Sequence, residues 1–244
     1  MLLKIFRRAF VRVGYSLISR GWADSPADLM NHFADYAYLK RFLDQFGINC
    51  VLDVGANTGG YAQLLRRVGY RGQIVSFEPN PDAFLPMSKI FRDDPHWNGF
   101  QLALGSARKS AGFHVGISDN ESSFLERSTE DWIARVDEVE VMRLDSLFTE
   151  IVKPLVHPRV LLKLDTQGYD LEVIEGAKTC LEQIIALQSE ISVKPLYQQM
   201  PHYTDALALY ESLGYSLMHL APVLRGKKHG NIVEYDAVMA RLPD

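Results

Sequence analysis

The sequence predicts an open α/β fold in which strands and helices alternate around one mostly parallel sheet. Residues 50–54 form an apolar run of strand type that leads through a glycine-rich turn into a helical pattern over residues 61–67. Residues 73–78 form a second short strand that ends in an acid, and residues 160–165 form a further core strand. This order is typical of a sheet that carries helices on both faces and binds a ligand at the carboxyl ends of its strands.

Length and composition limit the class of protein. At 244 residues, of which 47% are hydrophobic and 23% charged, the chain is long enough to bury a full core. The net charge of −4 provides no basic field, so we expect no nucleic-acid partner. The two cysteines, Cys50 and Cys180, lie in apolar surroundings without CxxC spacing, which indicates reduced core residues of a cytoplasmic protein.

Residues 1–45 are predicted to form an N-terminal helical region ahead of a domain over residues 46–244. Residues 1–20 contain five basic side chains and no acid, with apolar residues at helical spacing, which indicates a basic amphipathic helix. Its arginines interrupt any secretory apolar segment, and its uncharged run is too short to span a bilayer. Two alternatives stay open: the helix packs on the domain or on a second subunit of a homo-oligomer, or it lies peripherally on the inner membrane surface.

The elements after residue 20 follow from periodicity and from turn residues. A turn at residues 24–27 starts a helix over residues 28–46, which is expected to cover the sheet and ends at Gly47. The remaining expected elements, in chain order, are helix 82–91, strand 100–104, strand 112–117, polar loop 118–123, strand 139–144, helix 171–177, strand 184–190, helix 203–213 and an antiparallel strand pair at 215–220 and 233–240. The segment around residues 110–145 departs from a simple strand-helix repeat, and we interpret it as a strand and loop insertion over the site.

The turn after the first strand favours one cofactor over another. A dinucleotide-binding fingerprint needs glycine at its second position, where the backbone approaches a pyrophosphate, but counted from Gly55 that position is Asn57. S-adenosylmethionine has no phosphate, and its ribose and amino-acid tail suit a polar loop. The sequence therefore favours an S-adenosylmethionine-dependent methyltransferase over an NAD-dependent oxidoreductase or epimerase.

Each predicted cofactor contact follows from a position at the carboxyl end of a strand. Glu78 can accept hydrogen bonds from both hydroxyls of a ribose. Gly55 and Gly59 are expected to allow close backbone approach, and Asn57 to offer polar contacts. The remaining predicted contacts are Asp53, which steadies the loop or engages the amino-acid tail, and Ala103 and Leu104, which lie beside the adenine.

Several motifs in one order make the chain similar to a known family. They are residues 53–59 (DVGANTG), 77–80 (FEPN), 122–123 (SS), 143–147 (RLDSL), 163–170 (KLDTQGYD) and 173–177 (VIEGA). On these motifs the chain resembles the FkbM family of S-adenosylmethionine-dependent methyltransferases. The resemblance implies a Rossmann-like class I methyltransferase fold with a seven-stranded sheet, and O-methylation of a sugar, glycan or related natural product. This chain has Gln167 and Asp170 where the family often has glutamate, so position 167 cannot act as a carboxylate.

Methylation of an alcohol needs a group that aligns the hydroxyl and removes its proton. Asp165 and Glu190 are expected to end adjacent core strands, so we predict Asp165 as the base or acceptor-orienting group, with Glu190 and Lys163 as weaker candidates. The alternatives are that Asp165 caps the following helix and that Glu190 pairs with Lys163 or Lys194.

Two other candidates for chemistry are weaker still. Asp145, Asp165 and Glu190 could together supply oxygen ligands for Mg²⁺, but they form no tight cluster in the sequence, so we expect no required metal. His114 could face the site as a base, although a histidine at the surface or core edge is the simpler interpretation. An alternative function for the whole chain is a non-catalytic Rossmann-like binding module, or one that contacts a membrane through residues 1–20.

Overall fold

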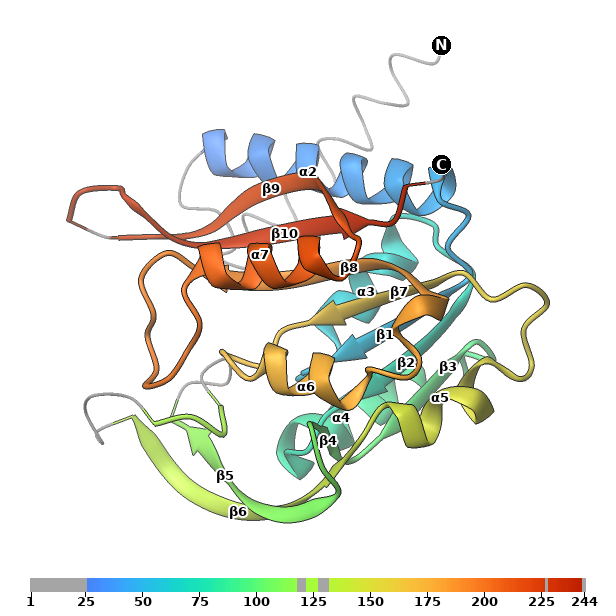
Figure 1. Ribbon diagram of the computed structural model, residues 1–244, viewed down its shortest axis with the longest axis horizontal. Coiled ribbons are helices and arrows are strands. Elements are labelled where there is room, and N and C mark those ends of the chain that lie inside the picture. Colours follow the sequence, from blue (N-terminus) through green and yellow to red (C-terminus); the bar gives the residue numbers. More distant parts are fainter. Residues whose placement is uncertain (1–25, 118–121, 127–131, 227, 243–244) are drawn as a thin grey trace. The chain divides into compact units, whose positions relative to one another are not determined.

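The computed structural model describes residues 26–117, 122–126, 132–226 and 228–242 (Figure 1). The basic helix expected over residues 1–20 lies outside these described residues. Contacts divide the chain into two compact units, Met1–Gln45 and Phe46–Asp244. The described part of the first unit is helix α2, Pro26–Gln45, close to the helix expected over residues 28–46. Within the part of the chain that the structure describes, no helix is long and apolar enough to cross a membrane.

The second unit is built on a seven-stranded sheet with the order β3-β2-β1-β7-β8-β10-β9 (Figure 1). Its strands are β1 Cys50–Val54, β2 Gln73–Phe77, β3 Trp97–Phe100, β7 Val160–Leu164, β8 Ile184–Ser192, β9 Ser216–Arg225 and β10 Ile232–Ala240. The first five strands in this order are parallel, and β10 is antiparallel to both of its neighbours. The predicted mostly parallel sheet with an antiparallel C-terminal strand pair is confirmed.

Helices cover both faces of this sheet. They are α3 Gly60–Arg67, α4 Pro81–Phe91, α5 Asp145–Val152, α6 Asp170–Gly176 and α7 Tyr203–Ser212, with a short 3₁₀ turn, η1, at Leu181–Gln183. Helices α5, α6 and α7 lie on one face, where Phe148, Ile174 and Tyr210 join Leu52 and Leu162 in the largest core cluster (Figure 1). Every residue of β1 and β7 is buried, as expected for central strands of a parallel sheet covered on both faces.

The predicted insertion is a second, three-stranded sheet with the order β4-β6-β5. Its strands are β4 Ala103–Leu104, β5 Lys109–Gly116 and β6 Ile133–Met142. Strands β5 and β6 pair antiparallel and form a long curved ribbon apart from the large sheet (Figure 1). Its small core consists of Ala103, Phe113, Val115, Val139 and Val141, so the alternating pattern read from the sequence does mark one buried face.

Several boundaries differ from the sequence prediction. The strands expected over residues 112–117 and 215–220 run over Lys109–Gly116 and Ser216–Arg225. The single strand expected over residues 100–104 is wrong, because the chain leaves the large sheet at Phe100 and enters the small sheet at Ala103. The strand expected over residues 139–144 begins earlier, at Ile133, and the sequence analysis missed helix α5 directly behind it. The strand expected to end at Glu190 continues to Ser192, since its last residues pair with β10.

Candidate active site

The turn after β1 is fixed by contacts with the rest of the unit. The amides of Gly55 and Ala56 both donate to the carbonyl of Phe77, at 3.0 and 3.1 Å, and so tie the loop to the end of β2. Gly55 has φ +75°, and a Cβ atom there would lie 2.0 Å from the carbonyl oxygen of Asp165. Gly59 has φ +81°, and a Cβ atom there would lie 2.9 Å from side-chain atoms of Met87 and Phe91. The protein's own packing therefore already requires glycine at both positions.

Glu78 is the most completely organised of the predicted cofactor contacts. Only 6% of the residue is exposed, and its two carboxylate oxygens accept hydrogen bonds from the backbone amides of Asn57, at 2.7 Å, and Asn80, at 2.8 Å. Burial raises the pKa of Glu78 to about 7, although both amide hydrogen bonds act in the opposite direction. Asn57 adopts a left-handed conformation, φ 48°, that directs its amide to this carboxylate.

Lys163 is buried in the middle of the sheet and pairs with two carboxylates. Its Nζ lies 3.2 Å from Asp53 Oδ1 and 3.2 Å from Asp165 Oδ2, and also 5.3 Å from the centre of the Tyr61 ring. Asp53 is fully buried, and burial raises its pKa while Lys163 opposes that shift. Of the two roles expected for Asp53, its complete burial and its ion pair favour the internal one, which is to steady the loop and Lys163.

Gln167 joins the two carboxylates that were predicted to be catalytic. Its Nε2 donates to Asp165 Oδ1 at 3.2 Å and to Glu190 Oε2 at 3.0 Å. Gln167 has φ 53°, an uncommon conformation for a residue other than glycine. The hydroxyl of Ser123 donates to its backbone carbonyl at 3.0 Å, and Tyr197 lies 3.4 Å from its Oε1. The insertion and residues at the ends of two core strands thus converge on Gln167.

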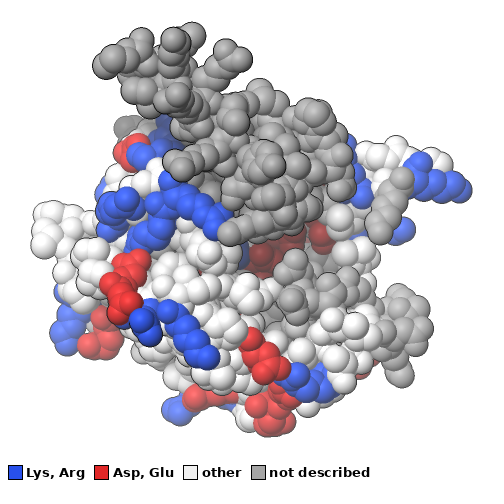
Figure 2. Space-filling model, turned by 180° about the vertical axis from the view of Figure 1, so that it is seen from behind, with Lys and Arg blue, Asp and Glu red and all other residues white. Residues whose placement is uncertain are grey.

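The surroundings of Glu190 disfavour its ionised form. Burial raises its pKa well above the ordinary value, and the negative charges of Asp165, Glu234 and Asp236 raise it further. The space-filling view from behind shows an acidic surface near the middle of that face (Figure 2). Glu190 is therefore a carboxyl group whose proton is held more tightly than usual.

Among the residues that the structure describes, the alternative roles of Asp165 and Glu190 are not observed. Asp165 does not cap helix α6, because Tyr169 occupies the cap position and Asp170 accepts hydrogen bonds from the backbone amide and hydroxyl of Thr166. Glu190 accepts from Gln167, whereas the ion pairs of Lys163 are with Asp53 and Asp165. Lys163 is thus the partner of Asp53 and Asp165.

The other predicted residues lie away from this group. Ala103 and Leu104 are buried, at 5% and 2% exposure, and pack in two different core clusters. Asp145 pairs with Arg143 at 2.6 Å and accepts hydrogen bonds from the amides of Thr179 and Cys180. Among the residues that the structure describes, no three acidic, histidine or cysteine side chains are grouped so as to hold a metal ion. His114 lies in β5, edge-on to Trp132.

The sequence analysis missed a polar row that continues across the sheet. Tyr61 donates to Gln188 Oε1 at 2.7 Å, and Gln188 Nε2 donates to Asp236 at 3.2 Å. The available signal was the change from apolar residues at 184–187 to a glutamine at position 188 of strand β8. It could not indicate the partners, because Tyr61 and Asp236 lie far away along the chain.

The insertion packs directly on the loop after β7. Phe124 lies 4.8 Å from Tyr169, ring centre to ring centre, and 5.0 Å from Phe113 of β5. Ser123 is fully buried, and besides donating to Gln167 it accepts from the amide of Leu125 at 3.0 Å. Aromatic and polar contacts together hold the small sheet against the group formed by Asp165, Gln167 and Glu190.

The amino-acid sequence of the chain is similar to those of known methyltransferases. The model of the methyltransferase FkbM domain matches residues 53–217. A 2-O-methyltransferase, NoeI, of Sinorhizobium fredii (strain NBRC 101917 / NGR234) is 25% identical over 166 residues, which are 62% of this chain and 67% of NoeI.

Solved structures resemble the chain in fold. A structure from Thermobifida fusca YX, described as a methyltransferase, has a TM-score of 0.52 at 9% identity, covering 88% of this chain and 82% of its own. The magnesium protoporphyrin IX methyltransferase of Synechocystis PCC 6803, solved with bound S-adenosylmethionine, has a TM-score of 0.48 at 11% identity, covering 98% of this chain and 96% of its own. At such identities the likeness concerns the fold alone.

Proposed function

Since this chain belongs to the FkbM family of methyltransferases, we propose that it methylates a hydroxyl oxygen of a sugar, glycan or related natural product. The observation that supports this proposal most directly is the hydrogen-bonded group formed by Asp165, Gln167 and Glu190, next to the turn after β1. An alcohol needs a proton acceptor in order to become a methyl acceptor, and this group contains one.

Bound S-adenosylmethionine supplies an electrophilic methyl carbon, whose bond to sulfur breaks as a bond to the acceptor oxygen forms. Residues at the carboxyl ends of β1 and β2 fit its polar parts. The carboxylate of Glu78 has two oxygens, each with capacity for a second hydrogen bond from a ribose hydroxyl. The polar turn that contains Asn57 suits the amino-acid tail. We assign cofactor binding to Glu78 and to the backbone of residues 55–59.

Glu190 is better suited than Asp165 to take the proton of the acceptor hydroxyl. Both oxygens of Asp165 are engaged, one by Lys163 and one by Gln167, so its charge is already compensated. Glu190 accepts one hydrogen bond, from Gln167, through Oε2, and among the described residues no donor is recorded at Oε1. Its raised pKa makes its ionised form the stronger base. Asp165 and Gln167 then orient it, and Lys163 limits the repulsion between the two carboxylates.

The oxygen acceptor is supported by NoeI, whose name describes a 2-O-methyltransferase. A neutral alcohol requires this acid-base arrangement more than an amine or thiolate does, since those nucleophiles react without prior loss of a strongly held proton. The acidic surroundings of Glu190 also fit an uncharged acceptor better than an anionic one.

Calorimetric titration with S-adenosylhomocysteine, with NAD as the parallel ligand, tests the cofactor assignment. We expect micromolar binding of the first, about −8 kcal/mol for a Kd near 1 μM, and none of the second. Methyl transfer from labelled donor to a panel of sugars and glycans, alongside peptide and catechol acceptors, then tests the acceptor class. Binding of S-adenosylhomocysteine without transfer to any hydroxylated glycan would contradict the proposed acceptor but leave the cofactor assignment intact.

A further inference from the structure

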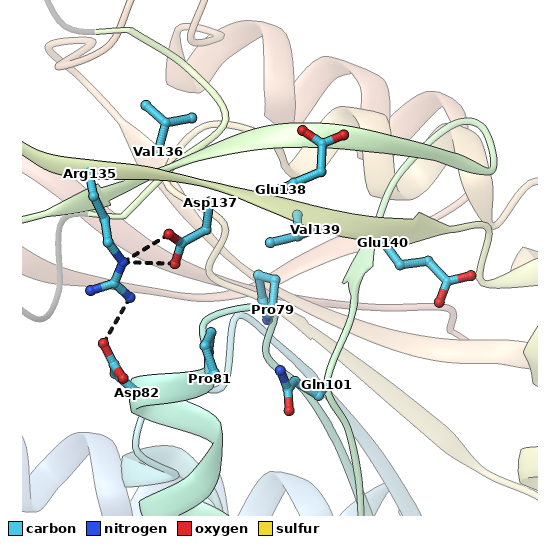
Figure 3. Close-up of a pocket in the computed structure, with 10 residues that line it drawn as sticks. All are labelled: Pro79, Pro81, Asp82, Gln101, Arg135, Val136, Asp137, Glu138, Val139 and Glu140. Carbon is cyan, nitrogen blue, oxygen red and sulfur yellow. Dashed lines mark hydrogen bonds and ion pairs between the residues drawn. The ribbon is translucent and has the colours of Figure 1, made fainter.

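A pocket of 680 Å³ lies between the end of β2 and the small sheet (Figure 3). Pro79 and Pro81 line one side, Gln101 a second, and residues 135–140 of β6 the third. Pro79 directly follows Glu78, so the pocket begins next to the predicted ribose contact. Asp165, Gln167 and Glu190 are not among its lining residues, so it is distinct from the acid-base group.

One edge of β6 faces the pocket without a partner strand. Strand β6 pairs with β5 over almost its whole length, from Ile133 to Val141, but with β4 only at Val141 and Met142. Over residues 133–140, no other strand pairs with this second edge within the part of the chain that the structure describes. Since backbone amides and carbonyls alternate along such an edge, the pocket wall offers both donors and acceptors.

The charged side chains that line the pocket make it acidic. Arg135, the only basic residue among the described residues that line it, pairs with Asp82 at 2.8 Å and with Asp137 at 2.9 Å (Figure 3). Glu138 accepts from the hydroxyl of Ser110 at 2.6 Å, and Glu140 lies 3.4 Å from Arg108. The lining therefore holds four carboxylates against one guanidinium that is already paired, so a phosphate or sulfate would be repelled.

The same pocket combines these polar groups with apolar surfaces. Pro79 and Pro81 provide rigid, apolar faces (Figure 3). This combination suits a ring with polar edges and apolar faces. The carboxylates and the unpaired edge of β6 can hydrogen-bond the polar edges of the ring, and the prolines can contact its faces. A sugar ring has this combination, whereas an extended apolar chain would leave the carboxylates without partners.

We propose that this pocket binds an uncharged or amino-bearing sugar unit of the acceptor, beside the unit that is methylated. This inference rests on the proposed function. Arg135 also donates to Asn80 Oδ1 at 3.3 Å, and the amide of Asn80 donates to Glu78. The acceptor pocket and the cofactor contact are thus connected through a single residue, Asn80.

The test uses the full chain saturated with S-adenosylhomocysteine on an array of neutral, amino, phosphorylated and sulfated glycans. We expect retention on neutral or amino glycans only. Gln101→Trp, which fills the pocket from an exposed position, and Glu138→Gln, which removes one carboxylate, should each weaken that retention at least fivefold. Glu150→Gln is the matched control, because Glu150 is exposed on α5 outside the pocket and pairs with Lys153.

Calorimetry with S-adenosylhomocysteine separates the outcomes. The proposal requires that both pocket variants keep the wild-type affinity for this ligand within about twofold. A large loss of that affinity would assign the pocket to the cofactor's adenine and overturn the proposal. So would retention of anionic glycans, retention of none, or binding of an extended peptide along β6 that the two variants abolish. Failure of the wild type to bind S-adenosylhomocysteine would instead contradict the proposed function.

Discussion

At the scale of single residues, Glu78 is a buried acid at the end of a strand, as the sequence predicted. Its protonation state depends on its surroundings in the folded protein. Two backbone amides hold its carboxylate, while burial raises its pKa to about 7. A ribose hydroxyl donates best to the ionised form. Binding of the cofactor and ionisation of Glu78 are therefore linked.

We predict that the affinity for S-adenosylhomocysteine rises with pH through about 7. Between pH 6 and pH 8 the ionised fraction of Glu78 rises from about a tenth to about nine tenths, so affinity should increase about tenfold. Glu78→Gln should weaken binding at pH 8 by about 10- to 100-fold, the effect of losing charge-assisted hydrogen bonds. It should also remove the pH dependence. Calorimetry at several pH values measures both effects.

The control for Glu78 is Glu175, an exposed residue of α6 that pairs with Lys178. Glu175→Ala should leave both the affinity and its pH dependence unchanged. Equal affinities of the Glu78→Gln and Glu175→Ala proteins would show that Glu78 does not contact the cofactor.

Gln167 provides a second prediction at this scale, concerning the acid-base group. Gln167→Glu replaces an amide donor shared by Asp165 and Glu190 with a third acid. The added charge opposes ionisation of Glu190, so the acid limb of the kcat–pH profile should move upward by about one pH unit. Gln183→Glu, at an exposed position of η1, should leave the profile unchanged. A lower kcat with an unmoved profile would indicate a merely structural role for Gln167.

At the scale of elements, the turn between β1 and α3 packs on the loop that follows β7. Gly55 is the contact point, because its Cα lies against the backbone of Asp165, and the amide of Asp165 in turn donates to the carbonyl of Val54 at 3.1 Å. Two loops that carry predicted site residues thereby fix each other's position. A side chain at Gly55 would separate them.

We predict that Gly55→Ala destabilises the protein severely. A methyl group 2.0 Å from a carbonyl oxygen, at φ +75°, combines backbone strain with overpacking, and the two effects together cost about 2–6 kcal/mol. Thermal or urea unfolding measures the loss. Gly60→Ala is the matched control: nothing lies within 4 Å of a Cβ atom there, and alanine suits the first turn of α3, so stability should be unchanged or slightly higher. Similar stabilities of the two variants would contradict the packing argument.

The small sheet of the insertion contacts the loop after β7 and also lines the pocket. This sheet has a small core of its own, and Phe124 and Ser123 attach it to the loop after β7. The same sheet supplies the β6 wall of the pocket. On the proposal that this pocket binds the acceptor, variation in this one segment changes acceptor choice without altering the strands predicted to hold the cofactor.

At the scale of the whole molecule, the cofactor loops belong to the most buried strands of the sheet, so binding should stabilise the entire second unit. At a S-adenosylhomocysteine concentration one hundred times its Kd, the expected gain is about 2.7 kcal/mol, which corresponds to a rise in Tm of roughly 5–10 °C for a domain of this size. Differential scanning calorimetry measures it. NAD at the same concentration should leave Tm unchanged, and an equal rise with NAD would contradict the choice of cofactor.

Much of this protein follows from local sequence patterns. The mostly apolar runs around Leu52, Val75 and Leu162 indicate buried parallel strands, because each has the length of a strand and is bounded by turn residues. The acid at position 78 and the turn before α3 each follow directly after an apolar strand, so they predict the sheet edge at which the cofactor binds. The ordered motifs indicated the family.

The tertiary structure decided which residues meet. Lys163 pairs with Asp53 across β1 and β7, and Gln167 joins Asp165 to Glu190 of the next strand, because parallel register places residues side by side that are distant in the chain. Burial, which depends on every packed neighbour, raises the pKa of Glu190 and of Glu78. The sequence alone determined the central strands of the large sheet and predicted the edge at which ligands bind. Strand pairing and burial decided which carboxylate we propose as the proton acceptor, since both depend on contacts between distant segments.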